Sequence, residues 1–386
     1  MERAESGSRA RVARWAIAAL STAVALVLGV ALVARLRARG GGAPAATAET
    51  SGLRAPAPPV SGEHPLDEAT VRALFGLDHR TEYRYDPVAH ILPVANRRRR
   101  FPWDEHPLGR VLCRSNNLGF AEDRPTEVEK HGLRVLVSGD SHTQGVVDNA
   151  ESFCHVAERE LQQRLARADV EVLNAGVGLT GPTCYLGVLQ RYLELRPDAF
   201  VAVLYAGNDF VEEIALALAT GRLPSPVVPA GYYETGERVH AEFEGPFSQG
   251  LNQAFRWHTF PDEVEFSLQA ACAAYREMKS VCDAHGIRML AVILPTKMDV
   301  EEDDHERWQA ASAALQLEPG DVIRELEVAR RFAECVRAAG LPCLDPTEDL
   351  RRADEVLYWR RDYHLGVRGH ALLGSLLARE LEPLLR

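Results

Sequence analysis

The sequence lacks the short motifs that mark zinc ribbons and nucleotide-binding folds. Its seven cysteines include no C-x-x-C pair, which argues against a zinc ribbon. There is no P-loop, and no G-x-G-x-x-G at the turn after the first predicted strand. No internal repeat is visible. We therefore expect neither a cofactor nor a metal centre. The odd number of cysteines leaves at least one thiol unpaired within the chain.

Positive charge is scarce outside the N-terminal region. The 386 residues hold 44 Lys and Arg against 55 Asp and Glu, a net charge of −11. Residues 1–59 contain eight Arg and three Glu, net +5, so the rest holds 36 basic and 52 acidic side chains, net −16. An acidic body is unsuited to phosphate contacts, so we expect no nucleic-acid partner. Arg97 to Arg100 are a local exception, which a solvated surface run explains.

A charge-free run of 20 residues, 15–34, follows a basic N-terminus of 14 residues. As a helix it would span roughly 30 Å, the thickness of a bilayer core, and it shows no polar stripe. We expect a single-pass transmembrane anchor with residues 1–14 cytoplasmic and the body extracytoplasmic, in the periplasm or at the cell surface. A cleaved signal peptide is the alternative. Residues 35–62 are rich in Gly, Ala and Pro, which predicts a flexible linker.

Short apolar runs alternate with helical spacing in the domain 131–386. We predict strands at 133–138, 170–174, 199–205, 288–294 and 342–345, and helices at 152–166, 185–195, 266–285, 325–339 and 367–385. This alternation indicates βαβ units around a parallel sheet that is covered on both faces. Two segments lie outside it. Residues 63–130 are predicted to be an N-terminal extension packed on the domain. The aromatic-rich insertion 210–263 is either a substrate-shaping lid or a packed surface insertion.

Candidate catalytic residues follow the predicted strands, at the sheet edge where open α/β folds bind ligands. Ser141 follows the first strand and Asn208 the third, while Asp362 and His364 precede the last helix. Acyl transfer needs a nucleophile, a base, a group that orients the base, and donors for the oxyanion. In an extended chain, residues two apart face the same side, so Asp362 can hold His364. The alternatives are a helix-capping Ser141 and a metal site formed by Asp362, His364 and His370.

Three further side chains lie near these motifs. Two of them have both a functional and a structural interpretation, and the third has a structural role. His142 either lines a pocket or lies in a solvated turn. Lys297 either contacts an anionic group of a substrate or is an ordinary loop lysine. His370 is expected to pack or cap at the start of the last helix.

At these residues the sequence resembles the SGNH or GDSL hydrolases. The resemblance covers the chain from about residue 130 to its end and rests on the motifs GDSHTQGV (139–146), VLNAGVG (172–178), AGND (206–209) and DYHLGVRGH (362–370). It implies a flavodoxin-like three-layer α/β/α sandwich. It also implies a triad of Ser141, His364 and Asp362, with an oxyanion hole formed by Ser141, Gly178 and Asn208.

The sequence departs from the common family pattern at four places. Its Asp-x-His spacing replaces Asp-x-x-His, and this shorter form resembles the exported branch that includes alginate O-acetyltransferase-like proteins. The Asn that often follows the His motif is Gly366, and the common G-x-N-D reads Ala206-Gly207-Asn208-Asp209, which keeps Asn but moves the Gly. The family's oxyanion glycine aligns with Leu179, so the Leu179 backbone is the alternative to Gly178.

These features together predict a membrane-tethered, extracytoplasmic serine esterase or O-acyltransferase. It would form an acyl-enzyme on Ser141 and act on an acylated small molecule or on O-acetyl esters of envelope or exopolysaccharide glycans. Hydrolase and transferase share these motifs. The alternative is a catalytically inactive SGNH-like domain that binds glycan or an assembly partner.

Overall fold

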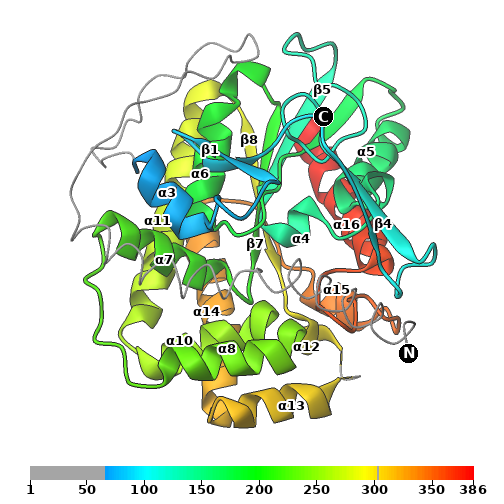
Figure 1. Cartoon of the computed structure of the whole chain (residues 1–386). Helices are drawn as coiled ribbons and strands as arrows, with labels where there is room; N and C mark the ends of the chain where they lie inside the picture. Colours follow the sequence, from blue (N-terminus) through cyan, green and yellow to red (C-terminus); the bar gives the residue numbers. More distant parts are fainter. Residues whose placement is uncertain (1–65, 302–303) are drawn as a thin grey trace, which may run out of the picture.

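The central element of the fold is a five-stranded parallel sheet. The computed structural model describes residues 66–301 and 304–386 (Figure 1). The strands are β5 (Leu133–Gly139), β6 (Val170–Asn174), β7 (Ala199–Tyr205), β8 (Arg288–Leu294) and β9 (Cys343–Leu344). Their order in the sheet, β6-β5-β7-β8-β9, is the flavodoxin-like order 2-1-3-4-5. The predicted α/β class with a parallel sheet is confirmed.

Alternate residues of each strand supply two separate hydrophobic cores, one on each face of the sheet. On β5, Leu136 joins one core, and Val135 and Val137 join the other. β7 is buried along its whole length, as its uninterrupted apolar sequence predicts. The sheet is therefore the middle layer of a three-layer structure.

Helices α5 (Phe153–Arg164) and α16 (Val367–Leu385) cover one face, where they pack on each other (Figure 1). The other face is covered by α6 (Pro182–Arg191), α7 (Asp209–Thr220), α11 (Glu263–His285) and α14 (Pro319–Ala338). A disulfide joins Cys272 on α11 to Cys335 on α14.

Two helices begin earlier than predicted because a proline starts each of them. α6 begins at Pro182 rather than at residue 185, and α14 begins at Pro319 rather than at 325. Proline suits the first helical position because its missing N–H would have no intrahelical partner there. The first turn of α14 also carries a capping box between Glu318 and Asp321. Both signals lie outside the apolar periodicity from which helices were predicted.

The described part of the N-terminal extension forms one helix and two antiparallel hairpins. Helix α3 spans Glu68–Phe75. The hairpins are β1–β2 (Tyr83–Asp86 with His90–Pro93) and β3–β4 (Arg98–Pro102 with Arg110–Arg114). Val71, Leu74 and Phe75 of α3 join the core that contains α6 and α7. Residues 1–65 lie outside the described range, and with them the predicted anchor (15–34) and linker (35–62). Within residues 66–301 and 304–386, no helix is both long and apolar enough to span a bilayer.

The insertion is helical and has a small core of its own. After α7 it forms α8 (Tyr232–Glu242), α9 (Glu244–Pro246), a π-helical turn (Phe247–Leu251) and α10 (Asn252–Thr259). These pack with α13 (His305–Ala314), where Trp308 lies in the same core as Phe247 and Leu251. Tyr363, which separates Asp362 from His364, also belongs to this core. The insertion therefore packs directly against the loop that carries the candidate base.

Candidate active site

The turn between β5 and a short helix, α4 (Ser141–Gln144), presents the candidate nucleophile. Asp140 caps this helix, and its carboxylate accepts a hydrogen bond from the His142 N–H at 2.9 Å. Gly139 allows the tight turn, because a Cβ there would lie 2.1 Å from Thr143 Oγ1. Ser141 thus starts a helix at the carboxyl end of the sheet, and its side chain stays partly accessible.

The structure brings Ser141, His364 and Asp362 together in a hydrogen-bonded row. His364 Nε2 lies 2.9 Å from Ser141 Oγ, and His364 Nδ1 lies 3.0 Å from Asp362 Oδ2. The His364 N–H also donates to Asp362 Oδ1 at 3.1 Å. Because a carboxylate only accepts, Nδ1 carries the proton and Nε2 is free to accept the Ser141 hydroxyl proton. The Asp-x-His segment is a turn rather than an extended chain, since Tyr363 has a φ of 63°.

Charges around His364 favour its protonated form. Burial lowers its pKa, but the charge and hydrogen bond of Asp362, with further contributions from Asp140 and Glu244, raise it above the ordinary value of 6.5. Burial raises the pKa of Asp140 to about 6, against the opposing charge of His364. The carboxylate of Asp140, which caps α4, also lies near the candidate nucleophile, with Asp140 Oδ2 3.3 Å from Ser141 Oγ.

The raised pKa of His364 predicts a pH dependence for any reaction in which it acts as a base. The protonated ring cannot accept the Ser141 proton, so kcat/KM should rise with pH through a midpoint above 6.5. Glu244→Gln removes one of the charges that raise this pKa, so it should move the midpoint to lower pH while activity remains. A pH–rate profile of both proteins is the measurement. A wild-type midpoint at or below 6.5, or one that Glu244→Gln leaves unchanged, would contradict this assignment.

The three predicted oxyanion donors come from three segments, which are the start of α4, the loop after β6 and the end of β7. The Ser141 N–H opens α4, where the first amides have no intrahelical acceptor. Gly178 lies against the nucleophile, since a Cβ built on it would be 3.5 Å from Ser141 Cβ, but its N–H donates to Gln144 Oε1 at 3.2 Å. Asn208, at the end of β7, donates from Nδ2 to the Ser248 carbonyl at 3.4 Å. Leu179 has a left-handed backbone, with a φ of 72°.

Two residues that the sequence did not point to surround Gly178. The Tyr83 hydroxyl donates to Gln144 Oε1 at 2.8 Å, so Gln144 accepts from both Tyr83 and Gly178. Tyr83 lies on β1, so the N-terminal extension reaches the oxyanion region. The sequence holds no signal for this contact, because 61 residues separate its partners and Tyr83 belongs to no recognisable motif.

A second part of the extension supports the loop that carries the triad. Glu105, in the turn between β3 and β4, accepts hydrogen bonds from the backbone N–H groups of Arg360 (2.6 Å) and Arg361 (3.0 Å). Trp103 packs edge-on against Trp359, with ring centroids 6.3 Å apart. Trp359 in turn donates from Nε1 to the Val146 carbonyl at 3.1 Å. The segment just before Asp362 is therefore fixed from both sides.

His142 and Lys297 differ from their predicted environments. His142 is buried rather than solvated, and its ring stacks on Tyr205. Lys297 is also fully buried, where it forms an ion pair with Glu301 and lies 5.6 Å from the centre of the Tyr363 ring. It is thus neither a loop lysine nor placed to meet a substrate.

His370 packs at the start of α16 as expected, and its Nδ1 accepts the Phe153 N–H at 3.2 Å. It takes no part in a cluster with Asp362 and His364. Within the described residues, the His and acidic side chains close enough to share a metal ion are His106, Asp148 and Glu151. Asp148 is paired with Arg110, and His106 with Glu151 at 2.9 Å. These pairings explain the group without a metal.

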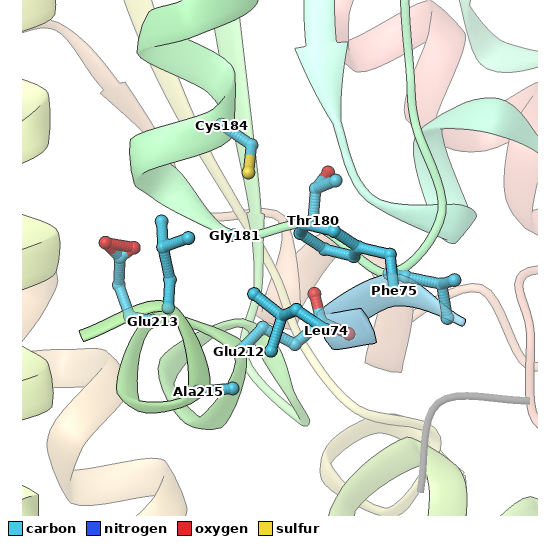
Figure 2. Close-up of a pocket in the computed structure, with 10 residues that line it drawn as sticks. Leu74, Phe75, Thr180, Gly181, Cys184, Glu212, Glu213 and Ala215 are labelled. Carbon is cyan, nitrogen blue, oxygen red and sulfur yellow. The ribbon is translucent and has the colours of Figure 1, made fainter. Parts of the chain in front are cut away.

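An apolar pocket lies beside the loop that follows Gly178 (Figure 2). Leu179, Thr180 and Gly181 form one wall, and residues of α3, α6 and α7 form the rest. Glu212 and Glu213 are its buried acidic members, and burial raises the pKa of the Glu212 carboxyl well above its usual range. Ser141, Asp362 and His364 do not line this pocket. The evidence for the candidate active site is therefore the hydrogen-bonded row of these three side chains, and not this cavity.

Comparison with protein-family models and with curated proteins found no match. Among solved structures, one similar chain is a putative lipolytic protein of the G-D-S-L family from Desulfitobacterium hafniense, with 15% identity, 65% of this chain and 100% of that chain covered, and a TM-score of 0.37. A lipase/acylhydrolase from Enterococcus faecalis matches with 15% identity, coverage of 66% and 97%, and a TM-score of 0.37. A catalytic mutant of an acetylxylan esterase from Geobacillus stearothermophilus matches with 15% identity, coverage of 66% and 96%, and a TM-score of 0.36.

Proposed function

We propose that this chain is a serine esterase or O-acyltransferase that forms an acyl-enzyme on Ser141. The observation that carries the proposal is the row of contacts in which Ser141 Oγ is 2.9 Å from His364 Nε2 and His364 Nδ1 is 3.0 Å from Asp362 Oδ2. These are the distances at which a base can take a proton from a nucleophile while a carboxylate holds its tautomer.

The reaction begins when Ser141 Oγ attacks the carbonyl carbon of an acyl ester and its proton passes to His364 Nε2. Asp362 then stabilises the imidazolium, and donors near Ser141 stabilise the tetrahedral oxyanion. When the intermediate collapses, the alcohol leaves with the proton from His364, and the acyl group remains as an ester on Ser141. Water or a sugar hydroxyl next attacks this ester and passes its proton to His364. As the second tetrahedral intermediate collapses, His364 returns that proton to Ser141 Oγ, and the acid or the new sugar ester leaves.

The substrate class and cellular place that we propose rest on the sequence. A charge-free run at residues 15–34, long enough as a helix to span a bilayer core, supports a membrane anchor. We place the domain that follows it on the extracytoplasmic side. O-acetylated envelope or exopolysaccharide glycans are the acyl esters that we propose as substrates there. The Asp-x-His spacing resembles that of the alginate O-acetyltransferase-like branch, so we propose a transferase beside the hydrolase. The alternative is an inactive domain that binds glycan. It does not account for the hydrogen-bonded row of Ser141, His364 and Asp362.

The proposal is tested by giving the full chain p-nitrophenyl acetate and longer p-nitrophenyl esters. We expect release of p-nitrophenol above the buffer rate. In a second assay, a polysaccharide acceptor is added with the acetyl donor, and acetylated polysaccharide identifies the transferase. If no ester is turned over and no acceptor is acetylated by folded protein, the binding-domain alternative stands.

A further inference from the structure

We propose that His142 is a positioning residue for the catalytic base, held as a neutral imidazole in one tautomer by Gln249 of the insertion. This inference rests on the proposed function, because it assigns His142 a role toward His364. His142 follows the nucleophile directly, and it links three segments that are far apart in the sequence.

Hydrogen bonds at both ring nitrogens define the tautomer of His142. The Leu365 N–H donates to His142 Nδ1 at 3.3 Å, and His142 Nε2 lies 3.0 Å from Gln249 Oε1. A backbone N–H can only donate, so Nδ1 carries no proton. Nε2 must then hold the proton and donate it to Gln249. The ring is buried and stacks on Tyr205 with centroids 3.8 Å apart, so it has no room to turn.

The position of His142 connects this tautomer to the base. Leu365 follows His364 in the chain, so the bond to Nδ1 fixes the backbone next to the base. The ring centroids of His142 and His364 are 4.7 Å apart. During the reaction His364 becomes a cation, and a second cation at this distance in a buried site would oppose it. A neutral His142 can therefore hold the base without repelling its charged form.

The groups that face His142 keep it neutral. Burial lowers the pKa of His142 well below its ordinary value, and positive charge on His364 lowers it further. Burial also lowers the pKa of the neighbouring His370 to about 3, so that ring is neutral near pH 7. The other ionisable neighbours are the phenol of Tyr205, which is stacked on the ring, the phenol of Tyr358, with centroids 6.3 Å apart, and the capping carboxylate of Asp140, which accepts the His142 N–H. Asp140 bonds to the backbone rather than to the ring, so no described carboxylate bonds to an imidazole nitrogen of His142.

Gln249 is held in place by contacts of its own. The main-chain carbonyl of Gln249 accepts a hydrogen bond from the Tyr205 hydroxyl at 2.8 Å. A Cβ on Gly207 would lie 2.4 Å from that carbonyl, so the turn of the insertion can approach only because this residue is glycine. The side chain of Gln249 is buried. The insertion thus contacts His142 through the side-chain amide of Gln249, and His142 in turn contacts the segment that carries the base.

The direct test is to label the full chain with ¹⁵N-histidine and record the ring nitrogens by NMR between pH 5 and 8. We expect His142 to show the neutral Nε2–H tautomer throughout, while His364 titrates. His142→Phe and His364→Ala assign the two signals. A His142 that titrates in this range, or that carries its proton on Nδ1, would overturn the proposal.

A kinetic test uses His142→Phe and Gln249→Leu, singly and together. His142→Phe keeps a ring on Tyr205 but removes the acceptor for Leu365, so kcat should fall by roughly 10- to 100-fold with KM unchanged. Gln249→Leu should act in the same direction, and the double variant should be no slower than His142→Phe. His240→Phe, at a buried histidine elsewhere in the insertion, is the matched control and should keep kcat. Effects that multiply in the double variant, or single variants that keep full kcat, would refute the role.

The two hypotheses fail in different ways. If the acyl-enzyme proposal is wrong, Ser141→Ala leaves turnover unchanged whatever His142 does. If only the His142 proposal is wrong, Ser141→Ala is inactive while folded His142→Phe and Gln249→Leu keep the wild-type kcat. Thermal unfolding of each variant identifies one that has not folded, and the NMR tautomer of the wild-type protein decides the question independently of every variant.

Discussion

Replacing Ser141 with alanine is expected to lower kcat/KM for p-nitrophenyl acetate by roughly 10³- to 10⁶-fold. The variant has no Oγ, so His364 Nε2 loses the hydroxyl 2.9 Å away and no acyl-enzyme can form. Fold stability should change little, because Ser141 is partly exposed and Asp140 still caps α4 through the His142 N–H. The measurement is steady-state hydrolysis together with a thermal unfolding curve for each protein.

Ser138→Ala provides the matched control for this substitution. Ser138 lies three residues upstream on β5 and is fully buried, and its hydroxyl has no hydrogen-bond partner among the residues that the structure describes. Its removal should leave kcat/KM within a few-fold of wild type. If Ser141→Ala were as active as Ser138→Ala, the proposed nucleophile would be wrong.

The second large effect is expected for Asp362→Asn, which should reduce kcat by about 10⁴-fold. An asparagine can still accept the His364 N–H, so the turn should persist. Its neutral amide can donate to Nδ1, which puts the proton on Nε2 and leaves no acceptor for the Ser141 hydroxyl. It also supplies no charge to stabilise the imidazolium.

The same substitution should also change the pH profile. Asp362 is the strongest influence that raises the pKa of His364, so the midpoint of the remaining activity should move to lower pH. Steady-state rates from pH 5 to 9 give both quantities. A loss of less than tenfold in kcat, with the midpoint unmoved, would show that Asp362 does not serve His364.

The candidate active site is assembled from the sheet domain, the extension and the insertion. The sheet places Ser141 at the end of β5, while Glu105 and Trp103 of the extension hold the loop before Asp362. The insertion core surrounds Tyr363, and Gln249 reaches His142. The two segments outside the strand–helix alternation therefore bear on the geometry of the catalytic base.

The sheet could be predicted from sequence because its strands are continuous apolar runs. β7 and β8 begin and end at the predicted residues 199–205 and 288–294, as does α16 at 367–385. The three residues of the hydrogen-bonded row could also be selected, since each follows or precedes such an element in a recognisable motif. The start of α14 at Pro319 was missed because its first turn is set by capping rather than by apolar spacing.

The supporting contacts could not be predicted, because they join residues that are remote in sequence and ordinary in type. His142 and Gln249 are 107 residues apart. A histidine in a turn after a strand is predicted to be solvated, and the contact with the insertion that helps to bury it has no signal in the local sequence. Lys297 is buried because Glu301, four residues later on the same short segment, neutralises it within the fold. A lysine after a strand gives no sign of such burial.

The most direct test of the central claim is to identify the residue that a serine-reactive phosphonate modifies. The full-length protein is treated with the phosphonate, digested and analysed by mass spectrometry, alongside Ser141→Ala. The account predicts one adduct on the peptide that contains Ser141, loss of esterase activity in proportion to labelling, and no adduct in Ser141→Ala. Labelling at another residue, or full esterase activity with Ser141 completely modified, would contradict it.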